Sequence, residues 1–398
     1  MKRWPTRPLE SFCRTGSGGT PSRKKMAYFE GGTVPWVKSG ELKESVVLST
    51  AERITQTATR ESNARIVPKN AVLVAMYGAT VGETAILGME AATNQAVCHI
   101  IPDPNTAHFR FVWYALKSRL DELLSKRVGG AQPNISQGII RHTAIPVPPL
   151  AEQSRIVKLL DEADELRKLR AQIDHRTATL IPALFHEMFG NVVHVEATRW
   201  PLKLLGEFAK VSYRLADKLD ASTKPEYGTR ILTISNVLLH GSIDTNVEKY
   251  SVVDPTGSAK ARLQKFDLLF NWRNGSEQHV GKTAIWEEQV RGEVLHVSFL
   301  LKIRTDQSQV NPYFLWTLLN RLRATGYFTR NARMQINRKF NASELSALKL
   351  PLPPLSLQME FASHMNEIRE MEVEQVASSR RLDDLLQSLL HRAFNGDL

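Results

Sequence analysis

Two long stretches of the chain carry the apolar spacing of an amphipathic helix. After Pro148-Pro149, apolar residues recur every three or four positions, and the same spacing follows Pro353-Pro354. Proline is tolerated ahead of a helix but not inside one, so each pair marks a helix start. The pattern predicts one long helix over residues 148–190 and a second over residues 353–398.

Helices of this length need a long partner. At 1.5 Å per residue, roughly 40 residues form a helix about 55 Å long, which buries its apolar stripe best against another helix. We therefore expect the two helices to form an antiparallel, coiled-coil-like pair. The alternative is that each helix packs on its own globular half. Pro182 lies inside the first pattern, where the second has Gln387, and should kink or end that helix early.

The stretch ahead of each long helix mixes short β-rich runs with helical runs. Their alternation is typical of a small α+β module, so residues 1–147 and 191–352 are expected to be two such domains. We predict strands at 72–77, 83–87, 267–272 and 282–286, and shorter helices at 109–124 and 313–322.

The second half of the chain repeats the first. At an offset of 205, Gln153 falls on Gln358 and Phe189 on Phe394. Nearer the front the offset is smaller: Phe111-Val112-Trp113 matches Phe314-Leu315-Trp316 at 203. A period of about half the chain indicates a duplicated domain and not a solenoid. The predicted fold class is therefore α+β, with two duplicated domains separated by two long antiparallel helices in pseudo-two-fold symmetry.

The charge of the chain is divided between its segments. Its 52 Lys and Arg and 41 Asp and Glu give a net charge of +11. Residues 151–190 hold 6 basic and 7 acidic residues, and residues 355–398 hold 4 and 8. The positive excess therefore lies in the globular segments, and a basic surface attracts phosphate polyanions. Solubility alone is an equally good explanation of this charge.

No catalytic motif in the chain is complete. Gly281-Lys282-Thr283 resembles the end of a phosphate-binding loop, but Gly275 lies one residue too far upstream and a strand pattern follows. Asn311-Pro312-Tyr313-Phe314 lacks the second proline of an amino-methyltransferase motif. The 11 histidines show no zinc-binding spacing. We therefore identify no catalytic set and no metal site.

Cysteine usage and hydropathy bear on the compartment. Cys13 and Cys98 are the two cysteines, so a disulfide framework is excluded and a reducing cytoplasm is the expected location. No apolar run approaches the ~18 residues that a membrane span needs.

Several motifs occur in the order typical of one protein family. Gly18-Gly19-Thr20-Pro21-Ser22 leads to the run Val34-Pro35-Trp36-Val37-Lys38-Ser39-Gly40-Glu41-Leu42, and the first long helix has the entry Pro148-Pro149-Leu150-Ala151-Glu152-Gln153. Together with the duplication, these features make the whole chain resemble the specificity (S) subunit of type I restriction–modification systems. The second half departs from the pattern, because Leu357 replaces the glutamate and no Gly-Gly-Thr-Pro occurs.

The resemblance implies a DNA-reading subunit that is not itself an enzyme and holds no cofactor. In this family each recognition domain reads one part of a bipartite site in double-stranded DNA. The paired helices set the spacing and bind two modification (M) subunits, which methylate adenine with S-adenosylmethionine, and restriction (R) subunits add ATP-dependent cleavage. An enzyme with an unrecognised active site and a scaffold that binds only protein remain the alternatives.

Base reading requires side chains with paired hydrogen-bond donors and acceptors, such as Arg, Lys, Asn and Gln. Polar segments occur at three matched places in the two halves: after the strands at 72–77 and 267–272, ahead of each Pro-Pro pair, and at 38–39 and 235–236. Phosphate contacts should outnumber base contacts, and a solvated turn is the alternative for each segment. The candidates for DNA contact are Lys38, Ser39, Tyr77, Thr80, Gln132, Asn134, Ser136, Ser235, Asn236, Arg273, Asn274, Ser276, Gln278, Arg330, Arg333, Gln335, Asn337, Arg338 and Lys339.

Overall fold

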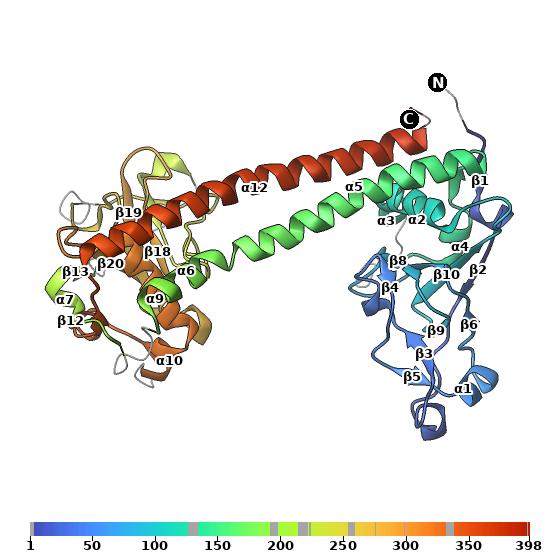
Figure 1. Ribbon diagram of the computed structural model, residues 1–398, viewed down its shortest axis with the longest axis horizontal. Coiled ribbons are helices and arrows are strands. Elements are labelled where there is room, and N and C mark those ends of the chain that lie inside the picture. Colours follow the sequence, from blue (N-terminus) through green and yellow to red (C-terminus); the bar gives the residue numbers. More distant parts are fainter. Residues whose placement is uncertain are drawn as a thin grey trace. The chain divides into compact units, whose positions relative to one another are not determined.

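The structure is a computed structural model with mixed α/β content (Figure 1). It describes residues 4–125, 134–191, 198–213, 222, 224–253, 259–274, 276–297, 299–331, 338–395 and 397–398. The chain divides into two compact units, unit 1 (Met1–Ile173 with Val376–Leu398) and unit 2 (Asp174–Gln375). Each unit contains part of both long helices, α5 (Leu150–Thr177) and α12 (Leu355–Asn395). The units therefore divide the chain within the long helices and not at the Pro-Pro pairs.

Unit 1 contains two sheets and one separate strand pair. The larger sheet has the order β2-β10-β7-β8-β4, with β4 parallel to β8 and the other pairs antiparallel. The smaller sheet has the order β5-β3-β9-β6, and β1 pairs with β11. The strands are β1 (Thr6–Pro8), β2 (Cys13–Ser17), β3 (Val34–Val37), β4 (Val46–Val47), β5 (Arg53–Ile54), β6 (Ile66–Val67), β7 (Val72–Ala75), β8 (Thr84–Leu87), β9 (Ala91–Thr93), β10 (Val97–Pro102) and β11 (Ala144–Pro146). The helices are α1 (Gln56–Glu61), α2 (Phe109–Ser118), α3 (Leu120–Ser125) and α4 (Gln137–Arg141), with 3-10 turns at Leu9–Ser11, Met26–Tyr28 and Ser39–Glu41.

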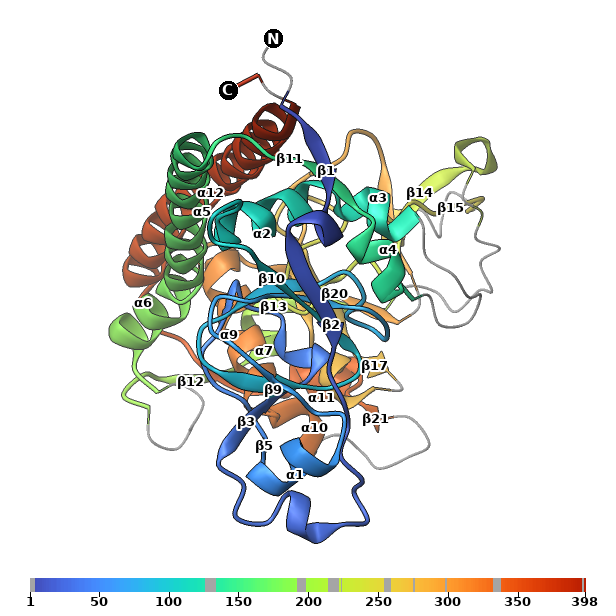
Figure 2. The ribbon, with the colours of Figure 1, turned by 90° about the vertical axis from the view of Figure 1, so that its right-hand side faces the viewer.

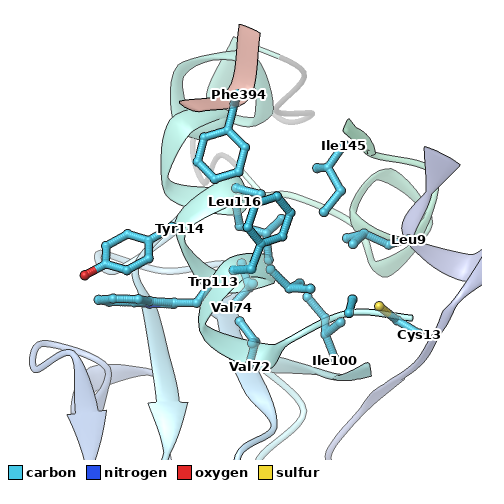
Figure 3. Packing of buried hydrophobic residues seen from close by; sticks show 14 of the residues in the cluster. Leu9, Cys13, Val72, Val74, Ile100, Trp113, Tyr114, Leu116, Ile145 and Phe394 are labelled. Carbon is cyan, nitrogen blue, oxygen red and sulfur yellow. The ribbon is translucent and has the colours of Figure 1, made fainter. Parts of the chain in front are cut away.

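Helix α2 lies at the centre of the main core of unit 1. Its residues 111–116 are all buried. Figure 3 shows Trp113 and Leu116 above the strand residues Val72, Val74 and Ile100. The end of α12 closes the core, because the ring of Phe394 lies 5.2 Å from that of Phe111. A segment from the far end of the chain therefore completes the main core of unit 1.

Unit 2 has a related set of sheets. Its main sheet has the order β13-β20-β16-β18 and is antiparallel throughout. A second sheet has the order β15-β14-β19, and two further pairs join β12 to β22 and β17 to β21. The strands are β12 (Leu202–Leu204), β13 (Ala209–Ser212), β14 (Thr229–Leu232), β15 (Tyr250–Ser251), β16 (Leu268–Asn271), β17 (Arg273–Asn274), β18 (Thr283–Ile285), β19 (Val294–His296), β20 (Leu300–Thr305), β21 (Arg338–Lys339) and β22 (Lys349–Pro351). The helices are α6 (Leu180–Phe189), α7 (Leu205–Phe208), α9 (Pro312–Ala324), α10 (Tyr327–Asn331) and α11 (Ala342–Ser346), with 3-10 turns at Pro225–Tyr227 and Glu277–His279.

Aromatic rings organise the core of unit 2. Phe189, near the end of α6, lies 4.8 Å from Phe314 of α9 and 5.5 Å from Phe361 of α12. Phe189 and Phe394 are equivalent in the repeat, and so are Phe314 and Phe111. In both units, then, the end of the helical segment from the other half of the sequence packs on the helix that follows the main sheet.

The two long helices contact each other inside each unit (Figures 1 and 2). In unit 1, Ile156 and Leu160 of α5 share a buried cluster with Leu386 and Leu390 of α12. In unit 2, the Gln375 amide donates a hydrogen bond of 2.9 Å to the Thr177 hydroxyl. Each helix also begins against its own globular segment, where Gln153 and Gln358 make buried hydrogen bonds.

Pro182 interrupts the first helical segment, as the sequence predicts. Helix α5 ends at Thr177, and α6 starts at Leu180 with the proline in its first turn. The amide that proline lacks would have no helical partner in a first turn. Helix α12 has no such break and runs for 41 residues.

The glutamine after each Pro-Pro pair anchors the helix start. Gln153 is fully buried; its side-chain oxygen accepts from the His108 amide at 2.9 Å and its nitrogen donates to the carbonyls of Thr106 and Pro148. Gln358 is equally buried, accepts from the Asn311 amide at 2.8 Å and donates to the Pro353 carbonyl at 2.7 Å. The repeated motif thus fixes each helix to the loop that precedes α2 or α9.

A charged pair with a tyrosine also joins each helix to its domain. In unit 1, Asp161 of α5 accepts from Arg110 at 2.6 Å and from the Tyr114 hydroxyl at 2.8 Å. In unit 2 the signs are exchanged: Arg369 of α12 donates to Glu287 at 2.7 Å, and the Tyr313 hydroxyl donates to the same carboxylate at 2.6 Å.

Three features of the described residues bear on other classes of protein. No helix among them is long and apolar enough to cross a membrane. They contain no group of three or more metal-ligating side chains. Cys13 and Cys98 are unpaired and buried, and burial raises the pKa of each thiol to about 12.

The contacts of the helix ends generate a test by hydrogen–deuterium exchange. Phe394→Ala should remove about 3–5 kcal/mol from the stability of unit 1, as phenylalanine deletion in a core does. Amide exchange should therefore accelerate in α2 and stay unchanged in α9. Phe189→Ala should have the reverse effect. Leu385→Ala, at a position of α12 that is 44% exposed, is the matched control. Equal acceleration in both helices for either variant would contradict the packing described above.

Candidate nucleic-acid interface

In unit 2 the strand pairing joins two segments that the sequence analysis identified separately. Strand β17 follows directly after β16 and pairs antiparallel with β21, so that Arg273 faces Lys339 and Asn274 faces Arg338 (Figure 2). The start of the polar loop after the central strand and the last two residues of the basic cluster, Arg338 and Lys339, therefore lie side by side.

Unit 1 brings together the matching segments. Tyr77, just after β7, forms an isolated antiparallel bridge with Asn134. The neighbouring amide of Ile135 donates to the Met76 carbonyl at 2.7 Å. Tyr77 is partly exposed, and burial of the remainder raises the pKa of its hydroxyl. The two halves thus build the same junction, with a shorter pairing in unit 1.

The loop at residues 273–279 is fixed at its base. Asn271 is fully buried, and its side-chain nitrogen donates to the His279 carbonyl at 3.1 Å. Its backbone carbonyl accepts from the Gly281 amide at 2.8 Å. Both ends of the loop are therefore held by one residue, while Ser276 and Gln278 are exposed to solvent. Asn271 was not among the candidates.

Arg273 lies beside an aromatic cluster. Its guanidinium carbon is 5.7 Å from the centre of the Phe299 ring. The Trp272 ring contacts Phe299 on one side and Tyr213 on the other. Phe299 is 42% exposed and Tyr213 is 44% exposed. The basic side chain thus stands on a surface that also offers apolar contact.

The third matched place contains one candidate that the structure contradicts. Asn236 is fully buried. Its oxygen accepts from the amide and hydroxyl of Thr233, and its nitrogen donates to the carbonyls of Asp244 and Val247. All its hydrogen-bonding capacity holds the loop together, so the prediction that Asn236 reads a base is wrong. Its neighbour Ser235 is exposed.

Two other candidates have local partners. The Lys38 amine lies 2.6 Å from the Glu52 carboxylate, and this hydrogen bond is the main cause of the lowered pKa of Glu52. The Ser136 hydroxyl accepts from the Ile139 amide at 3.2 Å and so caps α4. Ser39 starts a 3-10 turn, Thr80 is half-buried and Arg330 is exposed. Gln132, Arg333, Gln335 and Asn337 lie outside the described residues.

Lys282, in the segment that resembles the end of a phosphate-binding loop, has a structural role. Its side chain is 6% exposed, and its amine donates to the carbonyls of Ile234 at 2.7 Å and Val237 at 2.5 Å. Burial lowers the pKa of the amine. The lysine therefore binds the polar loop near Ser235 to the turn before β18. Sequence reasoning also missed a face of α9, where Trp316, Asn320 and Arg323 lie at helical spacing and donate to the same region.

Comparison with known proteins places this geometry in a family. A family model for the type I restriction modification DNA specificity domain matches residues 1–175. The specificity subunit of the type I restriction enzyme EcoR124I/EcoR124II from Escherichia coli is 29% identical over 154 residues, covering 37% of this chain and 38% of that protein. The EcoKI specificity subunit from Escherichia coli K12 is 25% identical over 333 residues, covering 76% of this chain and 68% of that protein. The match with the first of these relatives therefore spans little more than a third of that protein's length.

Solved structures resemble the whole chain in fold. A chain from a structural study of complex assembly and conformational transition of the type I R-M system matches with a TM-score of 0.68 at 17% identity, covering 100% of this chain and 99% of that chain. The type I restriction–modification S subunit from M. genitalium matches with a TM-score of 0.56 at 15% identity, covering 98% and 96%. The resemblance drawn from the sequence motifs is confirmed: residues 1–175 match the model of the type I restriction modification DNA specificity domain, and the chain as a whole is similar to the specificity subunits of these systems.

Proposed function

We propose that this chain is the DNA specificity subunit of a type I restriction–modification complex and that it reads a bipartite site in double-stranded DNA. The observation that carries the proposal is the junction found in both units. Polar segments from distant parts of each half meet just beyond the central strand, at Tyr77 with Asn134 and at β17 with β21. Each junction would read one part of the site, and Asn236 is excluded from the contacting residues.

The repeated contacts support a duplicated reader. Gln153 and Gln358 make equivalent hydrogen bonds, and Phe394 and Phe189 pack on equivalent phenylalanines. Two equivalent domains carried by antiparallel helices would have pseudo-two-fold symmetry and approach the duplex in opposite orientations, as paired DNA readers do. The length of the helices would then set the separation of the two half-sites.

Exposed apolar side chains of the two long helices suit a protein partner. Leu166, Leu169 and Ile173 of α5 are 52%, 46% and 46% exposed, and Val373 and Val376 of α12 are 72% and 52% exposed. Apolar side chains grouped on a surface mark interaction sites. We assign this surface to two modification subunits, which would supply S-adenosylmethionine and methylate adenine. Restriction subunits would join the same complex, and the chain itself would be non-catalytic and cytoplasmic.

The experiment that tests this function is genome-wide mapping of methylated adenine in cells with and without the chain. A bipartite methylation motif should be present with the chain and absent without it. A motif that persists without the chain would contradict the proposal. Methyl transfer or DNA cleavage by the purified chain alone, given S-adenosylmethionine, Mg²⁺ and ATP, would favour an enzyme. DNA affinity of the complex that is insensitive to salt would favour a scaffold that binds only protein.

Arg273 is the residue of the second junction best suited to guanine. Arg273→Ala should relax the preference at a single base pair of the second half-site by ~1–3 kcal/mol, the usual contribution of a bidentate contact. Competition binding by the assembled complex, with site variants and random DNA, measures the change. Arg262→Ala, in an exposed pair with Glu293 at 2.6 Å, is the matched control. An equal loss of affinity for specific and random DNA would exclude base reading by Arg273.

Helix length generates a separate expectation. Inserting four residues, about one turn, into both α5 and α12 lengthens the pair by roughly 6 Å, which is about two base pairs of duplex. Methylation mapping should then return both half-sites unchanged with a longer spacer between them. An altered half-site with an unchanged spacer would refute the role assigned to the helices.

A further inference from the structure

A tight turn at residues 238–242 in unit 2 lies outside every segment that the sequence analysis considered. The Leu238 amide donates to the Ser242 carbonyl at 3.0 Å, and the Gly241 amide donates to the Leu238 carbonyl at 3.1 Å. Leu239 and His240 at its tip are exposed. The His240 ring nitrogen Nε2 lies 2.6 Å from the Ser242 hydroxyl, which restricts the orientation of the imidazole.

One face of α9 holds the backbone of this turn. The Trp316 indole donates to the Gly241 carbonyl at 3.0 Å, and Arg323 donates to the Leu239 carbonyl at 2.9 Å. Gly241 has a φ of +89°, and a Cβ there would lie 2.8 Å from the Trp316 ring, so the close approach requires glycine. An exposed turn is thus fixed by two long side chains of a buried helix.

The same arginine connects the turn to the 273–279 loop. Its second terminal nitrogen lies 3.4 Å from the Gln278 carbonyl, so one guanidinium joins the two backbones. Lys282 makes a parallel connection by donating to Ile234 and Val237, just ahead of the turn. Arg323 and Lys282 therefore fix the backbone of the turn to that of the loop that carries Arg273.

The two units protect the edge of the main sheet in different ways. In unit 1 the outer edge of β8 is covered by β4, with Val46 opposite Ile86. In unit 2 the amide and carbonyl of Thr283 on β18 are satisfied by the Asn320 side chain and the Trp316 indole. Trp113, the equivalent of Trp316, has no hydrogen-bond partner for its indole among the residues that the structure describes. A covering strand would have protected the edge equally well, so edge protection alone does not explain a fixed polar turn.

We propose that the 238–242 turn is a further DNA-contacting element of unit 2, in which His240 contacts a base edge and Arg323 is the residue that positions the turn. A reading element needs a rigid backbone and an exposed side chain that can donate or accept. The turn has both, and it is joined to Gln278 of the candidate interface. The inference rests on the proposed DNA-reading function of the chain.

The test uses the complex of the full chain with its modification subunits and a duplex carrying the mapped site. Binding is measured for every single-base change in both half-sites. His240→Ala should reduce the discrimination at one position of the second half-site by roughly tenfold, while the first half-site serves as an internal reference and stays unchanged. His364→Ala, an exposed histidine of α12, is the matched control and should change neither half-site.

Two variants of Arg323 distinguish a positioning role of this residue from a direct contact with phosphate. Arg323 reaches the Leu239 and Gln278 carbonyls from two different terminal nitrogens of a planar fork, whereas a lysine has a single amine to place between them. Arg323→Lys should therefore lose the discrimination that His240→Ala loses, and the slope of affinity against salt should stay unchanged. A lysine variant with full discrimination, together with an Arg323→Gln variant whose salt slope falls by about one, would make Arg323 a phosphate contact and overturn the positioning role.

The outcomes distinguish this inference from the function on which it rests. If the wild-type complex has no preference for any sequence, the proposed function fails. If it reads a bipartite site and His240→Ala leaves every base preference intact, the proposed function stands and the role of the turn is refuted. His240 is exposed, so its replacement should leave the thermal unfolding of the chain unchanged.

Discussion

The packing of phenylalanines at the helix ends is the constraint on which the rest of the structure depends. Phe394 lies on Phe111 in unit 1, and Phe189 lies on Phe314 in unit 2. Each core is thereby completed by a helix that begins in the other half of the sequence. Since burial of such a side chain stabilises a core by several kcal/mol, neither of the globular segments 1–147 and 191–352 contains its whole core. The junctions of polar segments that we propose to read DNA are built on these two cores.

The buried glutamines determine how precisely those junctions are placed. A buried amide that satisfies several backbone groups at once holds a helix start in one orientation, because leaving any of those groups unpaired costs about 1–3 kcal/mol. Gln153 and Gln358 do this at the first turn of each long helix. The bipartite reading that we propose would need each long helix to leave its globular segment at a fixed angle, and this hydrogen bonding favours that condition.

Local patterns predicted much of the architecture, and contacts between distant segments account for most of what they missed. The Pro-Pro pairs, the break near Pro182 and the strands at β7 and β16 follow from backbone geometry and apolar spacing, which act over a few residues. Asn236 was misjudged because an asparagine that can pair with a base can equally well pair with four groups of its own loop. Arg323 was missed because its partners, Leu239 and Gln278, come from two other segments.

The exchanged charges on the two long helices affect which helix can pack on which globular segment. Asp164 of α5 falls on Arg369 of α12 at the repeat offset of 205. Asp164 is almost fully buried and pairs with Lys168 of its own helix at 3.0 Å, and its charge also acts on Lys117 of α2, whereas Arg369 pairs with Glu287. Exchanging the two helices would bring an arginine against a half-buried lysine in one lobe and an aspartate against a glutamate in the other. Such like-charge encounters are unfavourable in a poorly solvated setting. The charges of each long helix therefore match the globular segment on which that helix begins and not the other one.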